Sequence, residues 1–227
     1  MFTYQFNFFF NHVVVDAKPE NIPELMGHFN NSFLPSFFEE ASALGVRKVI
    51  RMNGIGDMEG VMVIFGSEIL SIQINDSSEE IKDKNFIFNK LQYVTDCLGK
   101  IEEIGKSHRV ATIITSVLPA RKDVVSKTYE TFFKEKIDEN VFEWNGRKVT
   151  RIDLKGHSLN FVKSVNRMTF VNSDGGTPKS FDGVLIEFDV NTPHENNTPR
   201  FEVTDIDFVS ELHDIARREL ISFISAV

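Results

Sequence analysis

The chain has 227 residues, of which 41% are hydrophobic and 22 are phenylalanine, and it carries a formal net charge of -8. This charge weighs against general binding to nucleic acid or to an anionic membrane, because such binding depends on an excess of Lys and Arg; a local basic patch would be the exception. The single cysteine, Cys97, excludes an intrachain disulfide and a zinc site built from cysteines, and a reducing cytoplasm fits such a chain best.

The N-terminal stretch alternates aromatic and polar residues from Phe2 to Phe10. This period of two predicts a strand with one buried face. The stretch lacks the basic start and the unbroken apolar run of a signal peptide. No run of about 18 apolar residues occurs, so we expect no segment that spans a membrane.

Apolar spacing and turn residues predict the remaining elements of the first half. We expect short helices over 19–29 and 33–44, a strand over 46–53, a hairpin over 61–75 that turns at Gly66-Ser67, and a long helix over 86–104. Gly45 is expected to end the second short helix, and Gly105 the long one. Ser77 and Glu80 resemble a capping box ahead of the long helix.

The second half is predicted by the same criteria. We expect a strand over 109–118 closed by Pro119, a helix over 123–136, strands over 141–144, 148–154, 159–171 and 183–190, and an exposed loop over 191–200. Asn145-Gly146 is the strongest short-range hairpin signal in the chain. The last segment, 204–227, has an apolar stripe of over four turns and resembles a capping box at Thr204 and Asp207, which predicts an amphipathic helix that covers the main core.

Two segments of the chain resemble each other. Phe37-Phe38-Glu39-Glu40 precedes Arg47-Lys48-Val49-Ile50-Arg51, and Phe132-Phe133-Lys134-Glu135 precedes Arg147-Lys148-Val149-Thr150-Arg151. Either a duplication or chance matches in a Phe-rich chain would explain this. We therefore predict an α+β fold of mainly antiparallel sheets covered by long helices. It would comprise two modules, 1–118 and 119–227, packed into one compact unit with sheets that join edge to edge. The strand that begins at the N-terminus could lie at a sheet edge.

One arrangement indicates enzymatic chemistry. Asp153 and Lys155 lie at the end of a predicted strand, and Glu143 lies on the strand before it. Two carboxylates that share a divalent cation, with a lysine that stabilises a phosphoryl transition state, would suit a metal-dependent nuclease or phosphoesterase. An acidic residue and a lysine beside a hairpin turn are also ordinary surface features.

The two basic strands are candidate anion-binding sites. Residues two apart on a strand share a face, so Arg47 and Arg51 would lie on one surface, and Arg147 and Arg151 on another. The alternative is a solvated face or edge whose charges block unwanted strand pairing.

The other motifs predict no cofactor and no metal site. The glycine-rich run from Gly54 to Gly60 has the wrong spacing for a dinucleotide loop and predicts a hairpin loop. The six histidines include no pair spaced for metal binding on a helix. His213 beside Asp214 could be a base with its orienting partner, or a half-buried helix residue that makes polar contacts. Cys97 has no neighbouring cationic cluster that would make it a nucleophile.

The C-terminal part also resembles a known family. Phe188-Asp189, a loop and then Leu212-His213-Asp214 in an amphipathic helix ending Phe223-Ile224 resemble the C-terminus of a sporadically distributed family of uncharacterised bacterial proteins. The stretch 66–118, including Arg109, is similar to the middle of that family. The resemblance implies a cytoplasmic accessory protein of a mobile operon, such as an antiphage-defence or toxin–antitoxin locus, and implies no catalytic residues.

Three functions follow from these observations. The first is a non-catalytic interaction protein: an adaptor or accessory subunit of a bacterial assembly that forms a homo-oligomer or binds a protein encoded nearby, with aromatic residues as interface anchors. The second is the metal-dependent nuclease or phosphoesterase that would use Glu143, Asp153 and Lys155. The third is a small-ligand-binding protein with a pocket between the two modules.

Overall fold

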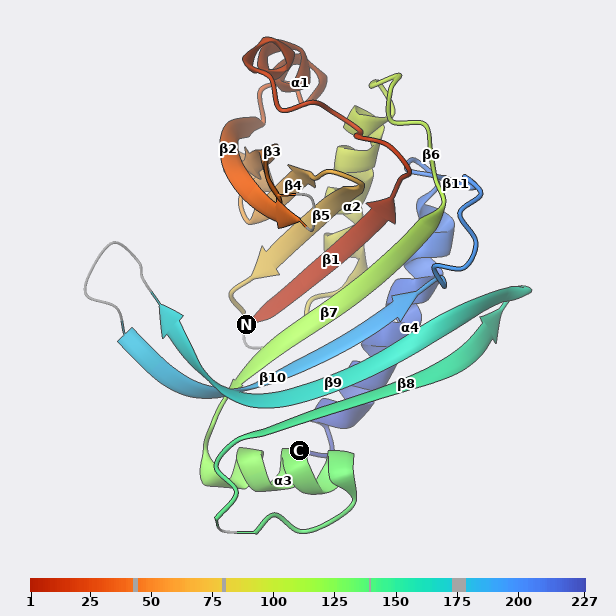
Figure 1. The fold of residues 1–227 in the computed structure, drawn as a ribbon. Helices are drawn as coiled ribbons and strands as arrows, with labels where there is room; N and C mark the ends of the chain where they lie inside the picture. Colours follow the sequence, from red (N-terminus) through yellow and green to blue (C-terminus); the bar gives the residue numbers. More distant parts are fainter. Residues whose placement is uncertain (43–44, 79–80, 139, 173–178) are drawn as a thin grey trace.

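The computed structural model describes residues 1–42, 45–78, 81–138, 140–172 and 179–227 (Figure 1). Over these residues the chain is an α+β protein built on one antiparallel sheet of nine strands. The sheet comprises β1 (Phe2–Phe9), β2 (Phe33–Ser42), β3 (Gly45–Gly54), β4 (Val61–Phe65), β5 (Ile69–Asp76), β7 (Arg109–Pro119), β8 (Trp144–Leu154), β9 (His157–Asn172) and β10 (Lys179–Asn191). A second, two-stranded sheet pairs β6 (Lys106–Ser107) with β11 (Phe201–Glu202). The helices are α1 (Ile22–His28), α2 (Lys84–Leu98), α3 (Lys122–Phe133) and α4 (Ile206–Ile224).

The strand order is β2-β3-β4-β5-β1-β7-β10-β9-β8. β1 and β7 pair antiparallel in the middle, so the expected α+β fold with a mainly antiparallel sheet is confirmed. β1 pairs with β5 on one side and β7 on the other along its whole length, so the expectation that it could lie at an edge is wrong. The outermost strands are β2 and β8.

The two longest helices, α2 and α4, lie on one side of the sheet. Alternate residues of β1 point toward this side, where the Tyr4 and Phe6 rings lie 6.0 and 6.2 Å from the His213 ring of α4. In Figure 1, α2 and α4 lie behind the sheet and the opposite face is turned to the reader. α2 has 15 residues and α4 has 19, so strands rather than long helices dominate the fold.

Burial of the apolar stripes explains why α2 and α4 form. The stripe of α2 buries Ile87, Leu91, Val94 and Leu98, as its spacing predicts. The stripe of α4 buries Val209, Leu212, Ala216 and Leu220, which confirms the terminal helix.

The N-terminal caps of α2 and α4 differ from those predicted. Asp83 caps α2, and Asp205 caps α4 by accepting a hydrogen bond from the backbone N–H of Asp207, so the Thr204 capping box is not formed. Glu80, which the other expected box requires, lies outside the described residues.

The helix predicted over 33–44 is instead strand β2. Its paired phenylalanines suit either structure, but each β2 residue pairs with one of β3, from Phe33 opposite Gly54 to Ser42 opposite Gly45. Pro35 does not distinguish the two structures, because it would lie in the first turn of the predicted helix, where proline is tolerated. Proline is tolerated on edge strands, and β2 is an edge strand.

The hairpin predicted at Asn145-Gly146 does not form. β8 runs unbroken from Trp144 to Leu154, and the turn occurs at Lys155-Gly156, whose φ angles are 52° and 79°. Positive φ at both central positions is what a two-residue hairpin loop of type I′ requires. Gly146 serves packing instead, because a Cβ there would lie 2.5 Å from Cε1 of Phe132 in α3.

Candidate functional site: the helix-free face of the sheet

The sheet face opposite the helices is predominantly polar. The pleat places on this face the residues that alternate with the buried aromatic ones. Its central part, over β5, β1, β7, β10 and β9, carries mostly amide, hydroxyl and carboxylate side chains: Thr3, Gln5, Asn7, Ser71, Gln73, Thr115, Asn160, Ser164, Glu187, Asp189 and Asn191. We call this surface the helix-free face. Asn7, Ser71 and Asn191 are buried there although no helix of the described chain covers them, so neighbouring side chains on the sheet shield them.

A hydrogen-bond network joins three strands at one end of this face. Asn191 of β10 donates from Nδ2 to Asp189 Oδ2 at 2.9 Å. Its Oδ1 accepts from Asn160 Nδ2 at 3.1 Å and from Arg109 Nη2 at 3.4 Å. The Arg109 guanidinium lies 4.4 Å from the centroid of the Phe9 ring and also donates from Nε to the carbonyl of Thr192. Asn191 is therefore held from both sides and fixes the orientation of Asp189.

Two carboxylates on β10 lie in a poorly solvated part of this face. Burial raises the pKa of Asp189; its hydrogen bond from Asn191 and the charges of Arg109 and Arg147 lower it by less. Burial also raises the pKa of Glu187, and the charge of Asp189 raises it further, against a smaller lowering by Arg147. Asp189 Oδ1 has no hydrogen-bond partner within the described chain. Carboxylates in such surroundings gain most from an added donor or cation.

An exposed apolar patch lies on the same face, at the far end of β9 and β10. Phe170 and Phe181 stack with their ring centroids 5.3 Å apart. Phe181 is 47% exposed and Met168 is 43% exposed. Gly183 permits this arrangement, because a Cβ there would lie 2.7 Å from Cε2 of Phe170. We call Met168, Phe170 and Phe181 the hairpin patch.

The structure does not bring the proposed catalytic residues together. Glu143 directly precedes β8 and Asp153 lies near its other end, so at about 3.3 Å per residue they are roughly 30 Å apart. They cannot share one cation. Lys155 forms an ion pair with Glu211 of α4, and Asp153 accepts a hydrogen bond from the Gly156 N–H within the turn.

All four arginines of the basic strands lie on the helix-free face. Arg51 donates to Ser36 at 3.2 Å, and Arg151 forms an ion pair with Glu195 at 3.0 Å. Arg47 and Arg147 are exposed. β3 and β8 are each the third strand outward from their central strand, so the two arginine pairs stand on opposite flanks of the polar surface. They form two separate basic sites and not one cluster.

His213 lies on α4 and its side chain is fully buried beneath the helix, whereas we expected a half-buried residue. Neither ring nitrogen has a hydrogen-bond partner within the described chain, although Asp214 Oδ1 lies 3.9 Å from Nδ1. Burial lowers the pKa of His213 to about 4; the charge of Asp214 opposes this, while Arg217 and Lys84 add to it. His213 faces aromatic rings of the core, so the structure gives it no access to a substrate.

Sequence reasoning missed the network around Asp189. Asp189 and Arg109 enter the sequence analysis only through a family resemblance, and Asn160 and Asn191 are not singled out there. One local signal was present: Glu187, Asp189 and Asn191 alternate with the apolar Phe188 and Val190, which places three polar side chains on one face. Nothing local indicated that Arg109 would join them.

Comparisons with known proteins identify no relative whose function could be used to interpret the site. No protein-family model matches the sequence, and no curated protein matches it. Among the described residues, no three or more His, Cys, Asp or Glu side chains are grouped so that they could hold a metal ion. Within the part of the chain that the structure describes, no helix is both long enough and apolar enough to cross a membrane.

Proposed function

We propose that this protein is a non-catalytic interaction subunit that binds a protein partner through the helix-free face. The observation that carries the proposal is the fixed, poorly solvated Asp189 carboxylate with one unpartnered oxygen, on a sheet face that no helix of the described chain covers. A buried acceptor without a donor is costly in the free protein, and a partner's donor would relieve that cost.

The chemistry of the face indicates what the partner presents. A lysine or arginine side chain would satisfy Asp189 and Glu187, since charge-assisted hydrogen bonds are the strongest available to a carboxylate. Apolar residues would contact the hairpin patch, because exposed aromatic groups are typical anchors of protein interfaces. The proposed partner is thus a protein with a basic residue beside an apolar segment, encoded near this gene in a bacterial operon and bound in the cytoplasm.

The strand order supports a further proposal, that the chain contains two related α+β modules. On the β1 side four strands follow the central strand outward, β5, β4, β3 and β2, and on the β7 side three follow it, β10, β9 and β8; in both cases the strand next to the centre leads into a helix, α2 or α4. The similar basic segments occupy the corresponding strands β3 and β8. In this proposal β7 belongs to the second module, where it corresponds to β1 of the first, and the boundary predicted at 118 moves to the segment before β7.

Co-purification with the products of neighbouring genes tests the interaction. The tagged wild-type protein should retain one of these products at a fixed ratio, measured by light scattering coupled to gel filtration. Phe181→Asp should abolish that complex, and Asp189→Ala should weaken it about tenfold or more, because the partner's basic group loses its acceptor.

Phe86→Asp is the matched control, since Phe86 is 42% exposed but lies on α2, away from the helix-free face. It should leave the complex intact. Loss of the complex in Phe86→Asp with retention in Phe181→Asp would place the interface elsewhere. If the wild type assembles only with itself, the partner is a second copy and the proposed neighbour is wrong. A metal-dependent phosphoesterase activity abolished by Asp153→Ala would favour the enzyme over the interaction subunit.

A further inference from the structure

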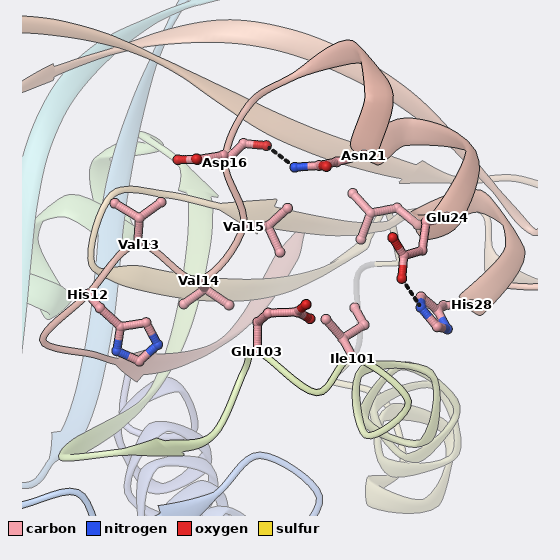
Figure 2. A pocket seen from close by; sticks show the side chains of 11 residues that line it. His12, Val13, Val14, Val15, Asp16, Asn21, Glu24, His28, Ile101 and Glu103 are labelled. Atoms are coloured by element: carbon pink, nitrogen blue, oxygen red, sulfur yellow. Dashed lines mark hydrogen bonds and ion pairs between the residues drawn. The ribbon is translucent and has the colours of Figure 1, made fainter.

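A cavity of about 610 Å³ lies at the end of the molecule that carries α1. The segment that follows β1 forms one wall of the cavity, α1 forms another, and the segment after α2 closes it from below (Figure 2). Its volume is in the range of pockets that hold small molecules. The cavity is separate from the helix-free face and does not depend on the function proposed for that face.

The cavity has an apolar floor. Val14, Leu25 and Ile101 are buried and line it, and Val13 and Val15 add aliphatic surface beside them. Figure 2 shows Val14, Val15 and Ile101 around the same space. An aliphatic or aromatic group in this space would remove apolar surface from water on both sides, which favours binding.

The charged residues that line the cavity are all acidic, apart from two histidines. Asp16, Glu24 and Glu103 contribute carboxylates, and no lysine or arginine is among the lining residues. Glu24 lies 3.5 Å from Nε2 of His28, and Asp16 forms an ion pair with Lys18 outside the lining at 3.0 Å.

Glu103 differs from the other two acids. Its carboxylate has no hydrogen bond or ion pair to any described residue. Glu103 is exposed, so it lies at the mouth of the cavity, and Figure 2 shows it between His12 and Ile101. It is the acid that is free to meet a ligand. With three acidic residues and no lysine or arginine in the lining, the cavity also disfavours an anion.

We propose that this cavity binds an organic cation with an apolar body, of the alkylammonium class. The apolar part would lie on Val14, Leu25 and Ile101, and the ammonium group would interact with Glu103 at the mouth. Both features are needed: the floor selects an apolar group and the acidic mouth selects its charge. No covalent step is involved.

Calorimetric titration with three probes of the same length tests the charge selection. Hexylammonium should bind with a dissociation constant of about 1 mM, as expected for a ligand of this size. Hexanol should bind more weakly and hexanoate should not bind. Hexylammonium binding should also weaken as salt is raised, because the mouth is solvated. Equal binding of hexanoate, or no binding of hexylammonium, would overturn the proposal.

Substitutions then locate the site. Glu103→Gln should weaken hexylammonium binding about threefold, and Glu102→Gln should not, because Glu102 does not line the cavity. Val15→Trp, which fills the space, should abolish binding, with circular dichroism used to show that the variant is folded. Binding that survives Val15→Trp, or that falls equally in both glutamine variants, would show that the probe binds elsewhere.

Discussion

The imidazole of His213 lies under α4 with three aromatic rings around it, those of Tyr4, Phe6 and Phe88. Beyond the aromatic groups, Asp214 and Arg217 of α4 and Lys84 of α2 act on it electrostatically. Protonation would place a positive charge in this apolar site without a close partner. Its pKa of about 4, against an ordinary 6.5, expresses the cost of doing so.

Acid should therefore destabilise the fold through His213. The folded state binds the proton less tightly than the unfolded state, so this contribution is complete above pH 6.5 and is lost as pH falls toward 4. Between pH 8 and pH 5 the loss is about 2 kcal/mol of unfolding free energy. His213→Leu should lack this loss, and urea unfolding at the two pH values would measure the difference.

His194→Leu is the control, because His194 is exposed in a loop. It should show the same pH dependence as the wild type. Asp189 and Glu187 act in the opposite direction, since their raised pKa values favour folding as pH falls. They are unchanged in both variants, so the comparison isolates His213. A His213→Leu protein as acid-sensitive as the wild type would contradict the assignment.

At the scale of the element, α4 covers the two strands of the second half that lie nearest the middle of the sheet. It packs on β7 and β10, and Thr112 of β7 donates a hydrogen bond to the carbonyl of Val209. Its buried residues Leu212, Ala216 and Leu220 close the core over these strands. An isolated helix of this length is marginal in water, so α4 and the strands below it stabilise each other.

Removal of residues 212–227 should leave a molten or aggregated chain. The deletion removes Leu212 and Leu220, and burial of each such side chain contributes about 1.5 to 3 kcal/mol, against a typical total stability of about 5 to 15 kcal/mol. The assay is cooperative thermal unfolding together with binding of a dye that reports exposed apolar surface. A truncated chain that unfolds cooperatively would show that α4 is an appendage.

Single substitutions in α4 test the contribution of core packing without shortening the chain. Leu220→Ala should lower the unfolding free energy by about 2 to 5 kcal/mol, because Leu220 is completely buried. Ser222→Ala, two residues further along the helix and exposed, should change it by less than about 0.5 kcal/mol. Similar effects of the two variants would contradict the packing described here.

Across the whole molecule, the two halves share one core. Tyr4 and Phe6 of β1 contact His213 of α4, and one continuous cluster of buried residues runs from Phe2 to Leu220. β1 and β7 are paired from Phe2 opposite Ser116 to Phe9 opposite Arg109. Separating the halves would therefore expose both the central backbone hydrogen bonds and the apolar side chains above them.

The protein should consequently unfold in one transition, even if its two halves are the related modules proposed above. Calorimetry should give a calorimetric enthalpy equal to the van't Hoff enthalpy, which is the criterion of two-state unfolding. A chain of two independent modules would instead show two transitions. Leu220→Ala provides the check, because in a single cooperative unit it lowers the midpoint of the whole transition and not of one part.

The sequence by itself determined those elements whose spacing of apolar residues fits only one type of secondary structure. The alternation from Phe2 to Phe9 could only bury one face of a strand, and the stripes of α2 and α4 matched a helix over more than three turns. The α+β class and the antiparallel character of the sheet follow from such elements. The basic strands β3 and β8 were also identified correctly as strands.

Only the tertiary structure decided the elements and sites that depend on distant partners. The 33–42 segment became a strand because β3 pairs with it, and Asn145-Gly146 stayed in a strand because α3 packs on Gly146. The network at Asp189 depends on Arg109, which is 82 positions before Asn191 in sequence and adjacent to it only through the pairing of β7 with β10. Local propensity contains no information about such pairings, because their free energy comes from surface buried between segments that meet only in the folded chain.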